Sequence, residues 1–388
     1  MMVKTLLKPN EAANAARTAY EFRGSNDLFS VYQEYEISEL FRSDHNSSEL
    51  FSGKAGAFGF KTSIGFGVLA MGKGRFENQA LLACRGTATF QDVLTDLNPS
   101  PRGTGTGSVA HSGFVRNFAS FKSNIHRFIS IHRPEVIHCV GHSLGGALAT
   151  LAADSIIHSS QATQTVLYTF GCPRVGTQGF AQKLSSHRLL GKDNIHRVYH
   201  SSDPVAMLPL WPFVHVPLPT GECYIGCDGF AFNPMKHSML QYAKSVSGKT
   251  WLDLKRPHPT WNSRYQGWVK AMENAGGGGL SLAKLSILNV ALNYMSRKVF
   301  KLSFQAFITA GMGVMTPLDQ ISYLLDKAAH VSTENKGLVA KIVSYVLRIC
   351  GYSGLALPTL TLASIYHAFR TLIRLLNGMA RLAMNAAH

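Results

Sequence analysis

The sequence predicts a mixed α/β fold with a mainly parallel sheet, followed by a helical region. Short apolar runs typical of buried strands alternate with helical stretches, and this alternation is typical of a parallel sheet covered on both faces. A run of four glycines at 276–279 then separates a C-terminal part of different character. We therefore expect an α/β domain at residues 1–275 and a basic amphipathic helical region at 280–388.

The expected strands are short runs rich in β-branched and other apolar residues. They are Ile64–Met71, Ala80–Arg85, Val136–Gly141, Thr165–Gly171 and Ile195–His200. Helices are expected between them, for example at Gly113–Ile131 and Ala147–Ser159. Ligands of such sheets bind beyond the carboxyl ends of the strands, so we expect the functional residues there.

Composition and charge indicate which classes of partner the protein binds. The 388 residues are 46% apolar, which is enough for a substantial core, and the formal net charge is +16. Such a charge favours anionic partners. There is no run of five basic residues and no nucleic-acid-binding motif, so an anionic membrane surface is preferred over nucleic acid. Six cysteines in this length do not form a disulfide framework, and no cofactor or metal site is expected.

The first residues bear on where the protein acts. Met1–Asn10 lacks the apolar stretch of 7–15 residues that a Sec signal peptide requires. We therefore expect a protein that is cytoplasmic or exported by a signal-independent route, and that associates with membranes.

A pentapeptide with the spacing G-x-S-x-G provides the candidate nucleophile. Gly141-His142-Ser143-Leu144-Gly145 follows the apolar run 136–140, and the small residues 146–149 open an expected helix. Neighbouring side chains crowd a serine on such a sharp strand-to-helix turn, so small residues are needed two positions before and after it. The helix that follows points its amide end at the same spot. Ser143 is therefore a candidate nucleophile, and the backbone N–H of Leu144 is a candidate oxyanion donor.

The acid that such a serine needs should follow it in the chain. In hydrolases with this turn the order is serine, acid, histidine. Asp203 comes directly after the strand expected at 195–200, and Pro204 ends that strand. Asp154 lies inside the helix after the nucleophile and is expected to point away, toward the surface.

Three histidines between Asp203 and the glycine run are candidates for the base, namely His215, His237 and His258. His237 has the best setting, because it would lie just before a helix on a loop that can reach across the sheet. The residues thus predict a Ser143–His237–Asp203 triad.

Five sequence blocks occur in an order that matches a known family. They are Arg85-Gly86-Thr87 with Asp96 following, Val109–Phe114, Gly141–Ala147, Tyr168–Gly176, and Asp203-Pro204-Val205 with Leu208-Pro209. In this order, over about residues 60–245, the chain resembles the class 3 lipase family, which includes fungal triacylglycerol lipases and many bacterial members. The resemblance implies an α/β-hydrolase fold and acyl-ester hydrolysis.

The resemblance also implies roles at the matching positions. Ser143 would attack the acyl carbonyl, His237 would take its proton and pass it to the leaving alcohol, and Asp203 would orient the imidazole. Thr87 would join the Leu144 N–H in the oxyanion hole. In the family the segment after the oxyanion residue often forms a lid, here 89–97, with a fixed surface helix as the alternative. His215 fits the place of an earlier structural histidine, and the stretch 221–228 departs from the family pattern.

The C-terminal part is basic and amphipathic. Residues 280–388 carry 11 Lys/Arg and 3 Asp/Glu, a net of +8. Apolar residues recur every three or four positions in Leu280–Phe304 and Ile365–Ala383, which gives each helix one apolar face. Such a helix can bury this face among lipid headgroups, and a helical bundle packed on the catalytic domain is the alternative. The uncharged run Ile349–Phe369 is long enough to span a bilayer, although Pro358 and two glycines make it a weak candidate.

The charge and the amphipathic tail favour phospholipid on an anionic bilayer over triacylglycerol droplets as the substrate. We therefore expect a phospholipase A-type serine hydrolase with some general lipase activity. A membrane-inserting toxin or membrane-binding module, and a soluble carboxylesterase, are the alternatives. Bacterial members of the resembled family without a signal peptide include antibacterial lipases delivered by contact-dependent secretion. If this chain is one of them, its producer needs a neutralising immunity protein.

Overall fold

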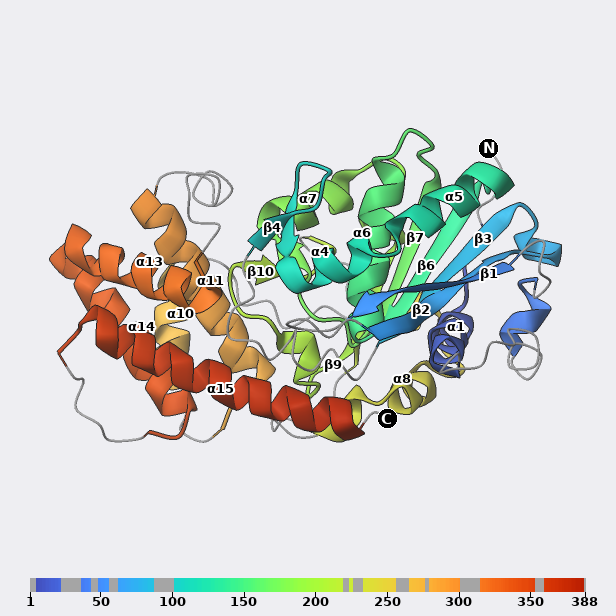
Figure 1. Cartoon of the computed structure of the whole chain (residues 1–388). Coiled ribbons are helices and arrows are strands. Elements are labelled where there is room, and N and C mark those ends of the chain that lie inside the picture. Colours follow the sequence, from blue (N-terminus) through green and yellow to red (C-terminus); the bar gives the residue numbers. More distant parts are fainter. Residues whose placement is uncertain are drawn as a thin grey trace.

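A computed structural model of the chain describes residues 5–21, 36–42, 48–55, 62–86, 101–218, 223–225, 233–255, 265–275, 279–300, 315–352 and 359–386. Its centre is a seven-stranded sheet with the order β1-β2-β3-β6-β7-β9-β11 (Figure 1). The parallel strands are β3 (Gln79–Cys84), β6 (Val136–His142), β7 (Gln164–Phe170), β9 (Ile195–His200) and β11 (Cys223–Ile225). β1 (Ser48–Ala55) and β2 (Thr62–Met71) form an antiparallel edge. The mainly parallel sheet predicted from the sequence is confirmed, and its five expected strands all form.

Helices cover both faces of this sheet, as the alternation of its side chains requires. Leu81 and Ala83 of β3 belong to the core beneath α1 (Pro9–Glu21) and α8 (Met239–Val246). Ala80 and Leu82 face the opposite core, beneath α4 (Ser112–Ala119), α5 (Lys122–His132) and α6 (Leu144–Ile157). The sheet therefore lies between two apolar layers, and only the ends of its strands are left for a site.

The single helix expected at 113–131 is in fact two helices. α4 ends where the Ser120 hydroxyl donates to the carbonyl of Asn117, and Phe121 leaves the helical conformation. The ring of Phe121 is fully buried. A local side-chain bond and an apolar anchor thus turn the chain within an otherwise helical pattern.

A smaller antiparallel sheet lies beside the main one. Its order is β10 (Phe213–Val214), β8 (Gly176–Thr177), β5 (Val109–His111) and β4 (Pro101–Gly103). α7 (Gln178–Ser186) follows β8 and packs on β5, β8 and β10. Two single-turn helices, η5 (Val205–Met207) and η6 (Pro234–His237), lie in the connections after β9 and after β11.

The C-terminal part is an assembly of helices that packs against the α/β part. Its members are α10 (Tyr265–Asn274), α11 (Leu282–Phe300), α13 (Pro317–Val331), α14 (Thr333–Ile349) and α15 (Leu362–Ala386). Their apolar faces turn inward and belong to the same core as α4 and α6, and α15 packs on η5 and η6. α10, which precedes the glycine run, packs on α11 and α14. A domain boundary at the glycine run stays a prediction.

The apolar run Ile349–Phe369 does not form one helix. α14 ends at Ile349, α15 begins only at Leu362, and residues 353–358 lie outside the described part of the chain. Among the residues that the structure describes, none of the helices has the length and apolarity needed to cross a bilayer. Residues 302–318 also contain no charged residue, and most of them lie outside the described part of the chain.

Candidate active site

Ser143 occupies a strained turn between a strand and a helix. β6 ends at His142, α6 begins at Leu144, and Ser143 between them has φ 57° and ψ −127°. A Cβ on Gly141 would lie 2.2 Å from the carbonyl of Gly145, and a Cβ on Gly145 would lie 2.1 Å from the carbonyl oxygen of Cys84. Both glycines are therefore needed for the close packing of α6 against β6 and β3, as the G-x-S-x-G spacing predicts.

The structure brings three of the predicted site residues together in a line. The Ser143 hydroxyl donates to Nε2 of His237 across 2.8 Å, and Nδ1 of His237 donates to Oδ2 of Asp203 across 2.9 Å. Ser143 follows β6, Asp203 follows β9, and His237 ends η6. All three side chains are buried, with exposed fractions of 7%, 0% and 1%. This arrangement can take a proton from Ser143 and stabilise the imidazolium that results.

Asp203 is a buried carboxylate with every oxygen engaged. Oδ2 also accepts a hydrogen bond from the Tyr242 hydroxyl at 2.6 Å, and Oδ1 accepts one from the backbone N–H of Val205 at 2.9 Å. Burial alone would raise the pKa of Asp203, but the charge and hydrogen bond of His237 and the hydrogen bond of Tyr242 together hold it below its usual range. Asp203 is thus ionised when His237 needs a negative partner.

Two further histidines fix the loop that carries His237. His142 donates from Nε2 to the carbonyl of His237 across 2.7 Å, and His200 donates from Nδ1 to the carbonyl of Lys236 across 2.6 Å. The second ring nitrogen of His200 lies 2.9 Å from the Ser245 hydroxyl oxygen. Consecutive carbonyls are therefore held from the two strands that also position Ser143 and Asp203. These contacts restrain the backbone from which the His237 ring extends toward Ser143.

The N-terminal helix contributes a phenol to the edge of the site. The Tyr20 hydroxyl of α1 donates to Nδ1 of His142 across 2.7 Å. A Cβ on Gly86 would lie 2.6 Å from this hydroxyl and 3.5 Å from Cβ of Ser143. Tyr20 therefore lies beside both the serine and the end of β3, where the predicted oxyanion segment begins.

The acid loop has its own anchor in Arg174. Its guanidinium lies 3% exposed and donates to the carbonyls of Met207 and Pro209, and its backbone N–H donates to Leu208. The segment that follows Asp203 is thereby tied to the segment that follows β7. Sequence reasoning placed Arg174 in a family block but gave it no role.

The remaining predicted residues fall in different places. Leu144 begins α6, whose first N–H groups have no partner within the helix and point toward Ser143. Thr87 and the segment 89–97 lie outside the described residues, as do Asp96 and His258. His215 follows β10 of the smaller sheet, whereas His237 is the histidine that contacts Ser143.

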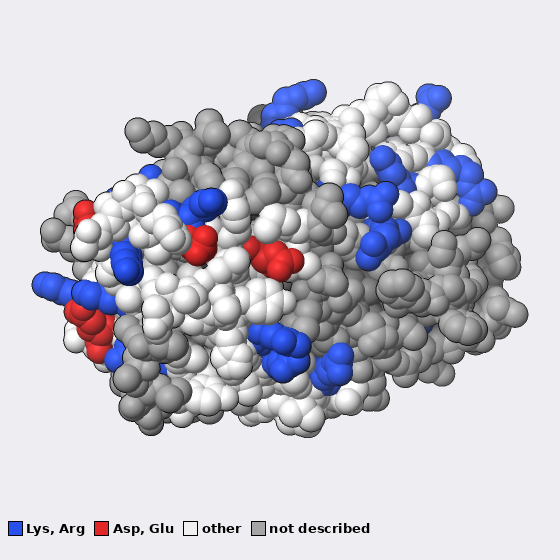
Figure 2. Space-filling view, turned by 60° about the vertical axis from the view of Figure 1, so that its left-hand side comes forward, with Lys and Arg blue, Asp and Glu red and all other residues white. Residues whose placement is uncertain are grey.

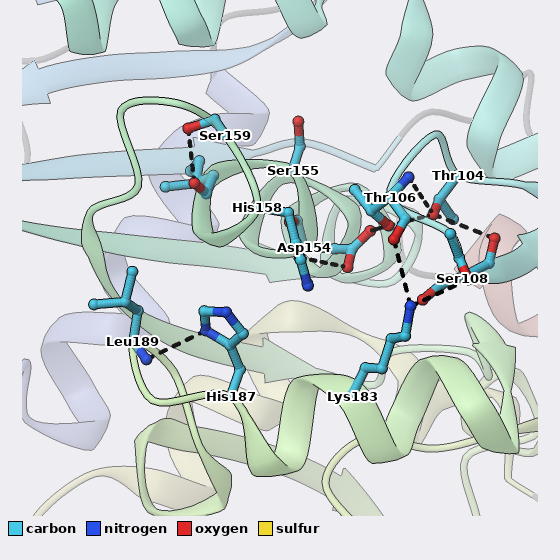
Figure 3. Close-up of polar contacts among 12 residues, drawn as sticks. Thr104, Thr106, Ser108, Asp154, Ser155, His158, Ser159, Lys183, His187 and Leu189 are labelled. Carbon is cyan, nitrogen blue, oxygen red and sulfur yellow. Dashed lines mark hydrogen bonds and ion pairs between the residues drawn. The ribbon is translucent and has the colours of Figure 1, made fainter.

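The expectation that Asp154 lies at the surface is wrong. Asp154 is 1% exposed, and every residue of α6 is buried. Its Oδ2 accepts a hydrogen bond of 2.7 Å from the Thr106 hydroxyl, and Oδ1 lies 3.3 Å from Nδ1 of His158 (Figure 3). Lys183 of α7 donates to the carbonyls of Thr106 and Gly107 and completes the cluster. Asp154 thus ties the loop before β5 to the helix of the nucleophile and takes no part in the triad.

The fold and the site together define an α/β-hydrolase with a serine at the strand-to-helix turn. Residues 81–213 match the sequence model of the family described as Lipase (class 3). This part of the chain is similar to the class 3 lipase family, as the order of its motifs indicates. Among the described residues no group of three or more metal-ligating side chains is placed to hold a metal ion.

Relatives of the chain include lipases, a toxin and a phospholipase. Secreted mono- and diacylglycerol lipase 2 of Gibberella zeae is 31% identical over 181 residues, which is 38% of this chain and 44% of that protein. Toxin TseL of Vibrio cholerae is 35% identical over 94 residues, 24% of this chain and 14% of the toxin. Phospholipase A(1) DAD1 of Arabidopsis thaliana is 28% identical over 159 residues, 34% of each chain. The matching part thus spans less than half the length of each relative.

Proposed function

We propose that the chain is a serine hydrolase that cleaves acyl esters of membrane phospholipids, a phospholipase A-type activity, with some activity on other acylglycerols. The observation that carries this proposal is the continuous hydrogen-bonded line from Ser143 through His237 to Asp203. A buried serine on this kind of turn, with a base and an ionised acid in line, is built for acyl transfer.

The reaction follows from the geometry. Ser143 Oγ attacks the ester carbonyl while its proton moves to Nε2 of His237, and the carbonyl electrons move onto the oxygen. The Leu144 N–H, with Thr87 as the second donor, receives the oxyanion. When the carbonyl re-forms, the bond to the alcohol breaks and His237 gives its proton to the leaving lysophospholipid. A water molecule, deprotonated by His237, then releases the fatty acid from Ser143.

The net charge of the chain and the names of its relatives support phospholipid as the substrate class. The chain carries a formal net charge of +16, so anionic bilayers attract it. One relative bears the name phospholipase A(1), and others are named mono- and diacylglycerol lipases. The phospholipid ester is the substrate that fits both the acyl-transfer site and the basic surface.

The test is product analysis with vesicles of mixed phospholipids. Wild-type protein should release free fatty acid and lysophospholipid, detected by mass spectrometry, and the position of the remaining acyl chain gives the regiochemistry. Ser143→Ala should abolish release, at least about 10⁴-fold, because nothing replaces the nucleophile. Residual permeabilisation of vesicles by this variant at the wild-type level would favour the membrane-inserting alternative. A rate on short-chain esters that is indifferent to aggregated substrate, with none on phospholipid, would favour the carboxylesterase.

We further propose that the chain acts as a toxin against competing cells and is neutralised in its producer by an immunity protein. Its likeness to Toxin TseL of Vibrio cholerae supports this role. Directed to the periplasm of a Gram-negative host, the wild-type chain should stop growth, whereas Ser143→Ala should be harmless. Growth arrest by both forms would separate the toxicity from the hydrolysis.

A further inference from the structure

The outer face of α15 is basic and also carries exposed leucines. Three arginines, Arg370, Arg374 and Arg381, are exposed at helical spacing, and α15 contains no acidic residue. Leu375 and Leu382 lie beside them with exposed fractions of 42% and 61%. The sequence left open whether the apolar face of this helix enters a membrane or packs on the protein, and the structure places Leu372 and Leu376 of that face fully buried in the protein core. Only the outer face is available for a partner.

This outer face adjoins the segment that carries His237. α15 packs on η6, and η6 leads directly into α8. Met235, two residues before His237, is 55% exposed, and Leu240 is 53% exposed. Lys244 is exposed one turn after Leu240. The same mixture of cations and exposed apolar side chains thus continues from α15 to the rim of the active site. We call Met235, Leu240, Lys244 and the exposed residues of α15 named above the outer ridge.

Two glutamates on the other C-terminal helices form ion pairs with lysines. Glu273 of α10 pairs with Lys341 at 2.8 Å, and Glu334 of α14 pairs with Lys298 at 2.9 Å. Figure 2 brings the C-terminal helices forward and shows acidic and basic groups interspersed on that face, with further basic groups lower down, at about the level at which α15 runs in Figure 1. The three elements that carry the outer ridge, η6, α8 and α15, contain basic residues and no acidic residue.

We propose that the outer ridge docks the protein onto the surface of an anionic phospholipid bilayer. The proposal rests on the function proposed above, because it supplies the lipid surface on which that site would act. Basic side chains would contact the anionic headgroups, and Met235, Leu240, Leu375 and Leu382 would enter the boundary between headgroups and acyl chains. Exposed large apolar residues next to cations fit this boundary better than they fit an aqueous acidic partner.

Docking in this orientation has a consequence for catalysis. η6 would rest against the lipid, so His237 and its neighbour Ser143 would lie close to the membrane surface. A phospholipid would then need to move only a short way out of the bilayer to reach the nucleophile. The helical region would thus position the catalytic site on its substrate without inserting a helix.

The experiment measures vesicle binding in a Ser143→Ala background, in which the lipids stay intact. Full-length protein is sedimented with vesicles of phosphatidylcholine alone or with phosphatidylglycerol added. A charge variant carries Arg370→Gln, Arg374→Gln and Lys244→Gln, and an apolar variant carries Leu375→Ser and Leu382→Ser. The control variant carries Arg116→Gln, Arg188→Gln and Lys192→Gln, which removes three cations that are also exposed, from α4 and the segment after α7. Melting temperatures establish that all variants are folded.

If the outer ridge docks on the bilayer, the variants should differ clearly in how strongly they bind vesicles. The charge variant should bind phosphatidylglycerol vesicles at least about tenfold more weakly, since each cation near an anionic surface contributes measurably. The apolar variant should also weaken binding, and the control variant should stay near wild type. Equal losses in the charge and control variants would mean attraction by net charge alone and would overturn the proposal, as would unchanged binding of the apolar variant. Wild-type protein that fails to hydrolyse dispersed phospholipid would refute the proposed function, while the sedimentation result would still decide the docking surface.

Discussion

At the scale of single residues, the site depends on how a buried charge is compensated. Asp203 is completely buried, and an isolated carboxylate there would be strongly disfavoured. Its hydrogen bonds from His237, Tyr242 and Val205 replace the lost water. Tyr242 holds this carboxylate from outside the triad, and it also accepts a hydrogen bond from the backbone of His200.

Replacing Tyr242 with phenylalanine tests this compensation. The change removes a donor to the ionised form of Asp203, so the pKa of Asp203 should rise. Because His237 needs the ionised acid, the acid limb of kcat/KM for a soluble short-chain ester should move to higher pH, and the rate at neutral pH should fall roughly tenfold. Tyr168→Phe is the matched control, since it removes another buried phenol that contacts Leu7 and His138. An acid limb that does not move in Tyr242→Phe would contradict this role.

At Asp154, in contrast to Asp203, the effect of burial on the pKa outweighs the effect of the hydrogen-bond partners. Burial raises its pKa, and the hydrogen bond from Thr106 and the charge of His158 offset this only in part. Its pKa in the folded protein thus exceeds that in the unfolded chain, so its contribution to stability falls as the pH rises through the folded pKa. Asp154→Asn keeps an acceptor for Thr106 and should raise the melting temperature at neutral pH by on the order of 1 °C, with a smaller gain near pH 4. A lower melting temperature at neutral pH would show that pairing with His158 outweighs burial.

At the scale of elements, strand ends were predictable and tertiary partners were not. Ser143 and Asp203 each directly follow an apolar strand, and this local pattern places both at the same edge of the sheet. Tyr20 is 122 residues from His142, and no periodicity in the sequence links the two. His142, in contrast, lies inside the nucleophile motif. The sequence therefore indicates that it is close to the site, but does not predict its bond to His237.

The wrong prediction that Asp154 lies at the surface has a cause that can be seen in the sequence. A position on a helix says where a side chain points only if one side of that helix faces solvent. α6 has the sequence LGGALATLAADSII, which is apolar nearly all round, and such a helix is buried on every side. That signal was present and predicts a buried, hydrogen-bonded Asp154. In α15 the amphipathic pattern was read correctly, but a pattern cannot distinguish a protein core from a lipid as the apolar environment.

The start of α4 provides a prediction about pH. His111 caps this helix by accepting the Gly113 N–H at Nδ1, and burial, followed by the charge of Arg116, lowers its pKa to about 3. The unfolded chain therefore takes up this proton at a higher pH than the folded protein does, so folding stability falls as the pH drops below the unfolded value. As the pH falls from 6 to 4, the protonation of His111 in the unfolded chain should lower the free energy of unfolding by up to about 1.4 kcal/mol per pH unit.

The measurement is the free energy of unfolding in denaturant at several pH values. His111→Asn keeps a capping acceptor, removes the titrating ring and should flatten the dependence on pH. His330→Asn, at a largely exposed position on α13, serves as the comparison, and the slope of His111→Asn should be flatter than the slope of this variant. Identical slopes for wild type and His111→Asn would contradict the assignment.

At the scale of the whole molecule, the two parts share one core. Buried residues of α11, α13, α14 and α15 belong to the same apolar cluster as α4, α6 and the segment around Trp211. The Trp211 indole N–H also donates to Asn293 of α11 across 3.1 Å. A core that crosses from one part to the other couples their unfolding. The glycine run therefore marks a change of composition without marking a break in packing.

This coupling predicts that a cavity in α15 weakens the distant active site. Leu372 is fully buried, whereas Leu375, three residues on, is 42% exposed. Leu372→Ala should cost roughly 2–5 kcal/mol of stability, and Leu375→Ala should cost far less. In Leu372→Ala, helix content measured by circular dichroism and activity on a soluble short-chain ester should be lost together, in one transition at a lower temperature. If instead the helices melt first while ester hydrolysis keeps its wild-type temperature profile, the two parts unfold independently, and the helical region would be an appendage to a self-sufficient catalytic domain.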